Sequence, residues 1–342
     1  MSSRAPIGYI GITTNDLTTN QGLKNLVPKK QIDSEFLYYL LKNKINYIKK
    51  LSSGSTFQEI SGRILESMKL PICTFLEQIK ISEILKFLDD KIELNNKINS
   101  ILEQISQAIF KHWFIDFEFP NNEGKPYKSS GGEFIDSELG KIPKGWKIIV
   151  LDELIKRNNK KINYKNNWQD LYLVDLSNTP QFSICINTFN KCNKLDSNIY
   201  ELNKFDILYG SIRPYFGKAG FSPINGCRTG TIFSFIPKNE AFYSFILLLI
   251  SNRKFIDFTI RFSRGTKMPI INWPDFVAYK TAIHDKIEIL NKLNDIVFKF
   301  INIISLNINQ NLILGNIRDI LLPKLITGKI RVSLDDNHKK EN

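Results

Sequence analysis

Apolar side chains recur at steps of three and four along residues 75–112, with polar side chains between them. The repeating positions are Ile81, Leu85, Leu88, Ile92, Ile98, Leu102, Ile105 and Ile109, and Asn95 is a polar residue in the same row. Such a row is typical of a helix that packs along its length on another helix. About 36 residues at about 1.5 Å each give a rod of about 54 Å. The pattern therefore predicts a long helix of coiled-coil type, within residues 75–119.

A second row of this kind occupies residues 282–322. Its apolar members include Ile287, Leu290, Leu293, Val297, Phe300, Ile304, Ile308, Leu312 and Ile317. Pro323 follows, and proline usually ends a helix because it lacks the backbone N–H. We predict a second long helix within residues 282–331, antiparallel to the first. Taken singly, each stretch would equally fit a core helix of a bundle.

Between the two helices the pattern changes to short pieces rich in β-forming residues. Residues 171–176, 206–209 and 231–236 are such pieces, separated by Gly, Pro and Asn. Residues 120–145 are polar and rich in glycine, which predicts a linker. The pattern indicates an α+β globular domain after that linker.

The chain resembles itself at an offset near 210 residues. Ser2, Arg4 and Gly8 align with Ser211, Arg213 and Gly217, and Gly22 and Pro28 align with Gly230 and Pro237. Further along, Gly54 and Thr56 align with Gly265 and Thr266 to within one residue. The two predicted helices fall at the same offset. A globule followed by a long helix therefore occurs twice. Counterparts of residues 145–210 are missing from the first copy, so we expect its globule to be incomplete.

These patterns give an α+β fold with two globular domains, the first incomplete, separated by two long antiparallel coiled-coil helices. The expected divisions are a truncated first domain at 1–74, the first helix at 75–119, a complete second domain at 120–281, the second helix at 282–331 and a disordered tail at 332–342.

The charge is strongly positive and unevenly distributed. The 47 Lys and Arg outnumber the 34 Asp and Glu, which gives a net charge of +13. Residues 144–276 carry 19 basic and 10 acidic side chains, whereas residues 77–112 carry five basic and six acidic ones. A clustered positive excess is typical of a domain that binds a polyanion.

The sequence lacks the usual signatures of catalysis. It contains no GxxxxGK[ST], GxGxxG, HExxH or GxSxG motif. His112 and His284 fall on the predicted helices and His338 in the charged tail, while Asp175 and Asp206 have strand-like apolar neighbours, so we read them as structural. Four cysteines without a CxxC pair fit reduced thiols; they are Cys73, Cys185, Cys192 and Cys227. We expect no catalytic or metal site.

The longest uninterrupted apolar run covers residues 245–250, which is too short to cross a membrane. No basic leader followed by an apolar stretch opens the sequence. These features predict a cytoplasmic protein without a membrane partner.

Small, polar and cationic residues recur in both copies and are the candidates for binding DNA. The segments SSRAPIGY and GSIRPYFG each place an arginine on a Ser/Pro/Gly turn, and a guanidinium fits phosphate oxygens or the O6/N7 edge of guanine. The alternative is a buried arginine that braces the turn. The segments SSGSTFQEISGR and RFSRGTK suit phosphate contacts, or else form a solvated basic loop. Aromatic residues at such spacing, Tyr215 among them, more often fill a core.

The candidates in the first copy are Arg4, Asn20, Gln21, Ser55, Thr56 and Arg63. Those in the second copy are Ser211, Arg213, Tyr215, Lys218, Arg228, Arg264, Thr266 and Lys267, with phosphate contacts expected of the lysines.

The sequence resembles the specificity subunits of type I restriction-modification systems. The resemblance covers nearly the whole chain and rests on SSRAPIGYI followed by TNQGLKNLVP, on SGSTFQEISGRILESMKLP, on the first long helix, on LGKIPKGWK and on RDILLPKLITGKI. It implies that each globular domain reads one half of a split double-stranded DNA target, while the helices set the distance between the halves.

The resemblance also implies partners. Two methyltransferase subunits would dock on the helices and a restriction subunit, which is also the motor, would join them. S-adenosylmethionine, ATP and Mg²⁺ would belong to those partners, so this chain would be non-catalytic. Because the first domain departs from the family pattern, a silent fragment and a half related to single-chain restriction-methylation enzymes remain alternatives. A scaffold that does not bind DNA is a third.

Overall fold

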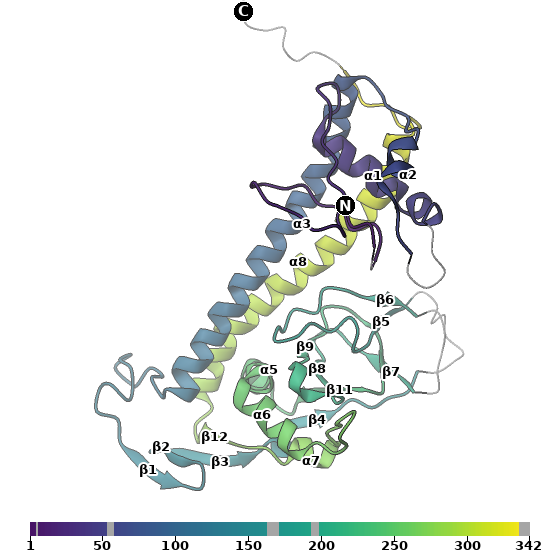
Figure 1. Cartoon of the computed structure of the whole chain (residues 1–342). Helices are drawn as coiled ribbons and strands as arrows, with labels where there is room; N and C mark the ends of the chain where they lie inside the picture. The colour runs from purple at the N-terminus through teal and green to yellow at the C-terminus, as the bar shows by residue number, and fades with distance from the viewer. Residues whose placement is uncertain (5, 53–57, 163–170, 193–197, 335–342) are drawn as a thin grey trace, which may run out of the picture. The chain divides into compact units, whose positions relative to one another are not determined.

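The computed structural model describes residues 1–4, 6–52, 58–162, 171–192 and 198–334 (Figure 1). The chain divides into two compact units: Met1–Leu94 with Gln310–Asn342 (unit 1), and Asn95–Asn309 (unit 2). It passes from unit 1 to unit 2 inside helix α3 (Phe75–Phe110) and returns inside helix α8 (Glu288–Ile326). Each unit therefore holds the start of one long helix and the end of the other.

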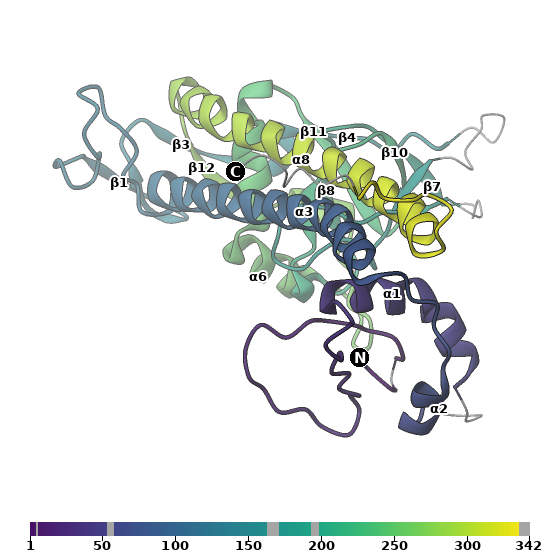
Figure 2. The same cartoon turned by 90° about the horizontal axis from the view of Figure 1, so that it is seen from above.

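The two long helices predicted from the apolar rows are present and antiparallel. In unit 1, Asp89 of α3 pairs with Arg318 of α8, and in unit 2, Asn99 of α3 accepts a hydrogen bond from Asn307 of α8 at 2.8 Å. From the first contact to the second, the residue number rises along α3 and falls along α8, so the two helices run in opposite directions. Both views show the two helices side by side (Figures 1 and 2).

The predicted helix ends are wrong in several places. Helix α3 ends at Phe110 and continues as a π-helical turn at Lys111–Ile115, which holds His112. Residues 282–284, expected in the second helix, lie instead in strand β12 (Lys280–His284). The strand forms there because it pairs with β3 (Trp146–Val150) across five residue pairs. His284 therefore lies on a strand rather than on a long helix.

Pro323 does not end α8, which continues to Ile326. Leu322, Leu325 and Ile326 are buried in the core of unit 1, and that burial outweighs the hydrogen bond lost at the proline. Gly328, at a φ of 69°, follows the last turn.

Within the described residues, α8 is long and apolar enough to cross a membrane by length and composition. The length of the longest uninterrupted apolar run does not reveal this property of α8, because the apolar residues of α8 are spaced rather than consecutive. In unit 2 its row Leu290, Leu293, Val297, Ile301, Ile304 and Ile308 is fully buried. Packing against the protein therefore accounts for that apolar row.

In the described residues of unit 1, α1 packs on the start of α3 and the end of α8, and α2 packs on α1 and the N-terminal segment. Helix α1 (Ser34–Lys50) is capped by Asp33, whose carboxylate accepts the backbone N–H of Phe36, and α2 (Gly62–Ser67) is capped by Ser61. One core cluster contains Phe36, Tyr39, Leu40, Ile81, Leu85, Leu322, Leu325 and Ile326. A second contains Met1, Ile7, Leu41, Ile48 and Ile60.

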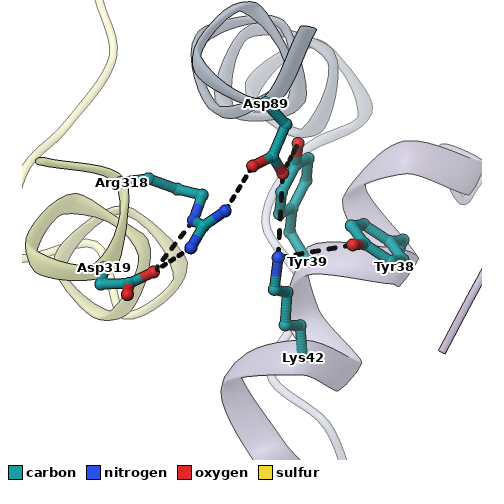
Figure 3. Close-up of polar contacts among 6 residues, drawn as sticks. All are labelled: Tyr38, Tyr39, Lys42, Asp89, Arg318 and Asp319. Carbon is teal, nitrogen blue, oxygen red and sulfur yellow. Dashed lines mark hydrogen bonds and ion pairs between the residues drawn. The ribbon is translucent and has the colours of Figure 1, made fainter. Parts of the chain in front are cut away.

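Three helices of unit 1 meet at Asp89 (Figure 3). Its carboxylate accepts a hydrogen bond from the Tyr39 hydroxyl of α1 at 2.9 Å and from Arg318 Nη1 of α8 at 2.5 Å. Lys42 Nζ lies 3.8 Å from the same carboxylate. One acidic side chain thus ties α1, α3 and α8 together.

Unit 2 contains two four-stranded sheets. The first has the order β4-β11-β8-β9 and the second β6-β5-β10-β7. The strands of the first are β4 (Ile155–Arg157), β8 (Ile207–Gly210), β9 (Ala219–Phe221) and β11 (Ile232–Pro237). Those of the second are β5 (Tyr172–Val174), β6 (Asn190–Lys191), β7 (Ile199–Leu202) and β10 (Gly226–Thr229). The three predicted β-rich pieces coincide with β5, β8 and β11.

The predicted linker at residues 120–145 is wrong in part. It contains a hairpin of β1 (Phe134–Ser137) and β2 (Gly140–Pro143), paired over four residues. Gly140, at a φ of 91°, allows the tight reversal between the two strands.

Helices cover the first sheet of unit 2. Residues 243–250 of α5 (Tyr243–Ser251) are all buried, and α5 contacts β9 and β11. Helix α6 (Arg253–Phe262) follows at once, and α7 (Trp273–Val277) and the short α4 (Leu151–Leu154) complete the α-helices of this unit's described residues, apart from α3 and α8. Two 3-10 helices, Pro214–Phe216 and Glu240–Phe242, accompany them. These helices thus hold the first sheet in place, including the end of β8, after which the candidate turn begins.

The internal repeat is present in the backbone hydrogen bonds. The Ser3 N–H donates to Gly22 O and Ile60 N–H donates to Ser3 O, just as Ser211 N–H donates to Thr231 O and Ile271 N–H donates to Ser211 O. The counterpart of Ser211 is therefore Ser3, not Ser2.

The turn that follows has one residue fewer in the first copy. Gly8 and Gly217 both adopt positive φ, which agrees with their alignment. Arg4 bridges Glu59 where Ile212 bridges Ile270, so Arg4 takes the place of Ile212 in this ladder. The alignment of Arg4 with Arg213 was therefore shifted by one residue.

Candidate DNA interface

The first part of the candidate interface is the turn that follows β8. Ser211 fixes its start, and the Arg213 N–H donates to Pro269 O at 2.7 Å. Arg213 itself has a left-handed backbone, with φ 51° and ψ 61°, and its side chain is exposed. A left-handed conformation costs a non-glycine residue about 1–3 kcal/mol, and such strain concentrates at functional sites. Tyr215 on the same turn is 41% exposed.

The second part is the loop between Arg264 and Ile270. These residues exchange two backbone hydrogen bonds of 2.9 Å, which closes a tight loop. Gly265, at a φ of 99°, allows the reversal, and a Cβ there would lie 3.2 Å from Met268 O. Thr266 and Lys267 are exposed in the loop.

Ile270 joins the two parts, because it bridges Ile212 on one side and Arg264 on the other. The structure therefore brings the turn of Arg213 next to the loop of Arg264, two of the segments predicted to contact DNA. The side chain of Arg264 is 76% exposed and lies 3.4 Å from Asp275 of α7. Two guanidinium groups and the Lys267 ammonium thus project from neighbouring loops, an arrangement that suits phosphate contacts and base readout.

Three candidates of the second copy are held by the protein itself, which corrects their assignment. Arg228 is 1% exposed, and its guanidinium donates to Ile232 O and Asn158 O at 2.6 Å each. Ser211 is buried and its hydroxyl donates to Thr231 O at 2.8 Å. The Lys218 ammonium donates to Leu176 O, and the side chain is half-buried. Their polar groups brace the fold instead of facing a ligand.

The candidates of the first copy are mostly exposed. Arg4, Gln21 and Arg63 are exposed, and Asn20 uses its side-chain oxygen to accept the Gly22 N–H at 3.0 Å. Ser55 and Thr56 lie outside the described residues.

Sequence reasoning missed Arg157, at the end of β4. Its guanidinium carbon lies 4.8 Å from the centre of the Trp273 ring and 5.3 Å from that of Phe233. Partial burial lowers the pKa of Arg157, and the side chain remains exposed. Trp273 begins α7, the helix that carries Asp275, so this stacked guanidinium is connected to the Arg264 loop through α7. No sequence pattern points to Arg157, because only the fold brings β4 to α7.

The described residues contain no group of three or more His, Cys, Asp or Glu side chains placed to hold a metal ion. The buried carboxylate of Asp206 accepts hydrogen bonds from Asn158, Asn203 and Ser234, so it is satisfied within the fold. This agrees with its structural interpretation.

Comparisons with known proteins point to one family. The family described as Type I restriction modification DNA specificity domain matches residues 1–104. The type I restriction enzyme MjaIX specificity subunit of Methanocaldococcus jannaschii is 35% identical over 351 aligned positions, which cover 97% of this chain and 77% of the relative. The HindI specificity subunit of Haemophilus influenzae is 46% identical over 88 residues, or 25% of this chain and 19% of the relative.

A solved structure shares the fold. The crystal structure of a type I restriction-modification S subunit from M. genitalium matches with a TM-score of 0.57 and 17% identity, and the match covers 98% of this chain and 82% of that chain. The class defined by this fold is an α+β protein with two globular units and two long helices. The chain belongs to the family of type I restriction enzyme specificity subunits.

Proposed function

We propose that this chain recognises a bipartite DNA target and directs partner methyltransferase and restriction subunits to it, without a catalytic centre of its own. The observation that carries the proposal is the group of exposed cations Arg213, Arg264 and Lys267 on two loops joined through Ile270. The arginines suit base edges as well as phosphates, while the lysine suits phosphates.

The long helices set the distance between the two halves of the target in this proposal. Half-sites read from one face of a duplex lie about 34 Å apart or a multiple of that distance. A helix of 36 or 39 residues, at about 1.5 Å per residue, is long enough for such a spacing.

The same helices offer docking surfaces for the partner subunits. On α3, Phe87 and Leu94 in unit 1 and Ile101 in unit 2 expose half or more of their surface. On α8, Leu306 in unit 2 and Ile313 in unit 1 do the same. Exposed apolar rows of this kind favour protein contacts. In this proposal S-adenosylmethionine, ATP and Mg²⁺ are bound by the partners, and the complex acts in the cytoplasm.

The proposal is tested by co-expressing the chain with the methyltransferase subunit of its own system and mapping methylated adenines across the genome. The test variant carries Arg213→Ala and Arg264→Ala. The matched control is Arg253→Ala, because Arg253 is also exposed and also pairs with a single carboxylate, Asp257. Loss of one good arginine contact to a base costs about 1–3 kcal/mol, so methylation of a split motif should be lost in the test variant only.

Binding of purified complex to DNA over a range of salt concentrations gives a second readout. Each lost phosphate contact should reduce the slope of log affinity against log salt by about one. Equal methylation and equal slopes in the test variant and the control would contradict the proposal.

A further inference from the structure

Helix α3 carries a buried carboxylate that holds residues 183–185, a segment of unit 2 that bridges strand β9 through Cys185 and Phe221. Glu103 is 7% exposed. It accepts hydrogen bonds from Ser183 Oγ at 2.7 Å, from the Ile184 N–H at 2.8 Å and from Cys185 Sγ at 3.3 Å. A buried carboxylate is tolerated only when such donors replace water. Residues 183–185 are therefore fixed to one position on α3.

The segment held by Glu103 is in turn packed against the turn that carries Arg213. The Phe182 N–H donates to Gly217 O at 3.1 Å. A Cβ at Gly217 would lie 2.7 Å from the Phe182 ring, and one at Gly220 would lie 2.6 Å from Ile184 O. Contacts this close leave no room for the segment and the turn to move independently.

A second attachment joins the same part of the sheet to the other long helix. Just after β9, Pro223 O accepts hydrogen bonds from Asn309 Nδ2 of α8 at 3.1 Å and from Ser305 Oγ at 3.4 Å. The part of unit 2 around β9 is thus attached to α8 through the Pro223 carbonyl and to α3 through the Glu103 carboxylate.

We propose that Glu103 is a positioning residue for DNA recognition. Through residues 182–185 it holds the Arg213–Gly217 turn in place on α3, so that a shift of the helix is transmitted to Arg213. The inference rests on the proposed function of Arg213 and adds the element that orients it.

The test replaces Glu103 by alanine in the full chain within its complex. A polar groove of about 310 Å³ runs beside Glu103, lined among others by Asn99, Gln107 and Asn187, so water can reach the freed donors and the fold should persist. The matched control is Gln104→Ala, which removes the next side chain of α3, an exposed one that donates a hydrogen bond to Ser100 of the same helix. The measurements are the thermal midpoint and the affinity for target and non-target DNA.

We expect Glu103→Ala to lower the thermal midpoint by several degrees relative to the control, because buried donors lose their charged acceptor. At a temperature where the complex is still folded, it should weaken binding of target DNA about 10-fold or more, with non-target binding close to that of the control. Glu103→Gln keeps the length and one acceptor oxygen, so it should recover most of the affinity. The decisive variant combines Glu103→Ala with Arg213→Ala. If Glu103 acts through Arg213, the double variant should bind target DNA as Arg213→Ala alone does.

Losses that simply multiply in the double variant would overturn the inference, as would an equal fall in target and non-target binding at that temperature. If Arg213→Ala alone leaves target binding unchanged, the proposed function fails instead. If Arg213→Ala weakens binding and Glu103→Ala does not, only the positioning role is wrong.

Discussion

Two arginines of unit 2 that look alike in the sequence have opposite environments. Arg213 is exposed on a strained turn, whereas the Arg228 guanidinium lies over the Tyr200 ring, 4.6 Å from its centre, and donates to two backbone carbonyls. Burial lowers the pKa of Arg228 to about 10, so it stays protonated at neutral pH. One arginine is available to a ligand and the other braces the fold.

Arg228→Ala should therefore destabilise the protein and should not selectively abolish DNA recognition. The change leaves Ile232 O and Asn158 O without their charged donor, which should lower the free energy of unfolding by about 3 kcal/mol. Urea denaturation measures the effect, and Arg253→Ala, on the surface, should stay within about 0.5 kcal/mol of the parent. Unchanged stability combined with lost DNA binding would restore Arg228 as a contact residue.

At the scale of single residues, the sequence predicts which side chains are candidates for binding DNA but not whether they are buried. Arg213, Arg264 and Lys267 lie in small, polar and cationic segments that recur in both copies, and the fold places them on adjoining loops. Arg228 is a candidate of the same copy, and the sequence around it does not show that its side chain is buried. Its burial follows from the place of β10 between β5 and β7, which is a tertiary property. Arg157 was missed for the same reason.

At the scale of the elements, Asp89 of α3 joins α1 and α8 through polar and charged contacts, in addition to the apolar packing between these helices. The carboxylate holds Tyr39 of α1 and Arg318 of α8 at hydrogen-bond distance (Figure 3). Burial, and then the hydrogen bond to Asp89, raise the pKa of Tyr39. The unfolded tyrosine ionises near pH 10, so the stabilisation from this group is fully present below about pH 10 and is lost as the pH rises further.

Asp89→Ala should loosen unit 1. It leaves a partly buried guanidinium and a hydroxyl without their acceptor, and hydrogen bonds to charged groups contribute about 1.5–3 kcal/mol each. We expect a loss of about 2–3 kcal/mol in the free energy of unfolding, measured by denaturant. The matched control Asp90→Ala removes the next carboxylate of α3, which is exposed, and should change little. Equal effects of the two changes would refute the role assigned to Asp89.

The elements themselves were largely predictable, and their ends were not. The apolar rows located both long helices, because a 3,4 spacing over ten turns has no other simple explanation. The prediction that the second helix ends at Pro323 was wrong, because burial of Leu325 and Ile326 extends the helix. Residues 282–284 were misassigned because their partner strand, β3, lies more than a hundred residues away in the sequence.

For the molecule as a whole, the structure describes two units connected by two continuous helices. The sequence repeat predicted this organisation, and the matching hydrogen bonds of Ser3 and Ser211 support it at atomic detail. The one-residue difference in the turn was not visible in the sequence, because Ser2 and Ser3 are adjacent and either one can be aligned with Ser211.

Lengthening both helices should lengthen the gap in the DNA target. A heptad inserted between Leu94 and Asn95 and another between Asn309 and Gln310 keep the packed face in register and add about 10 Å, or about 3 base pairs. Methylome mapping of the double insertion measures the gap. A heptad in one helix alone, as the control, should disrupt the pair and abolish methylation. An unchanged gap in the double insertion would show that the helices do not set the spacing.

Because unit 1 is built from both ends of the chain, the order of synthesis constrains its folding. When residues 1–94 have left the ribosome, their partners Leu322, Leu325 and Ile326 do not yet exist. About 230 residues follow first, which takes roughly 12–46 s at about 5–20 residues per second. The contiguous unit 2 can fold during that interval, while Phe36 and Leu40 still lack part of their core. During synthesis, residues 1–94 therefore keep apolar surface exposed until α8 is complete, and a chaperone can bind such surface.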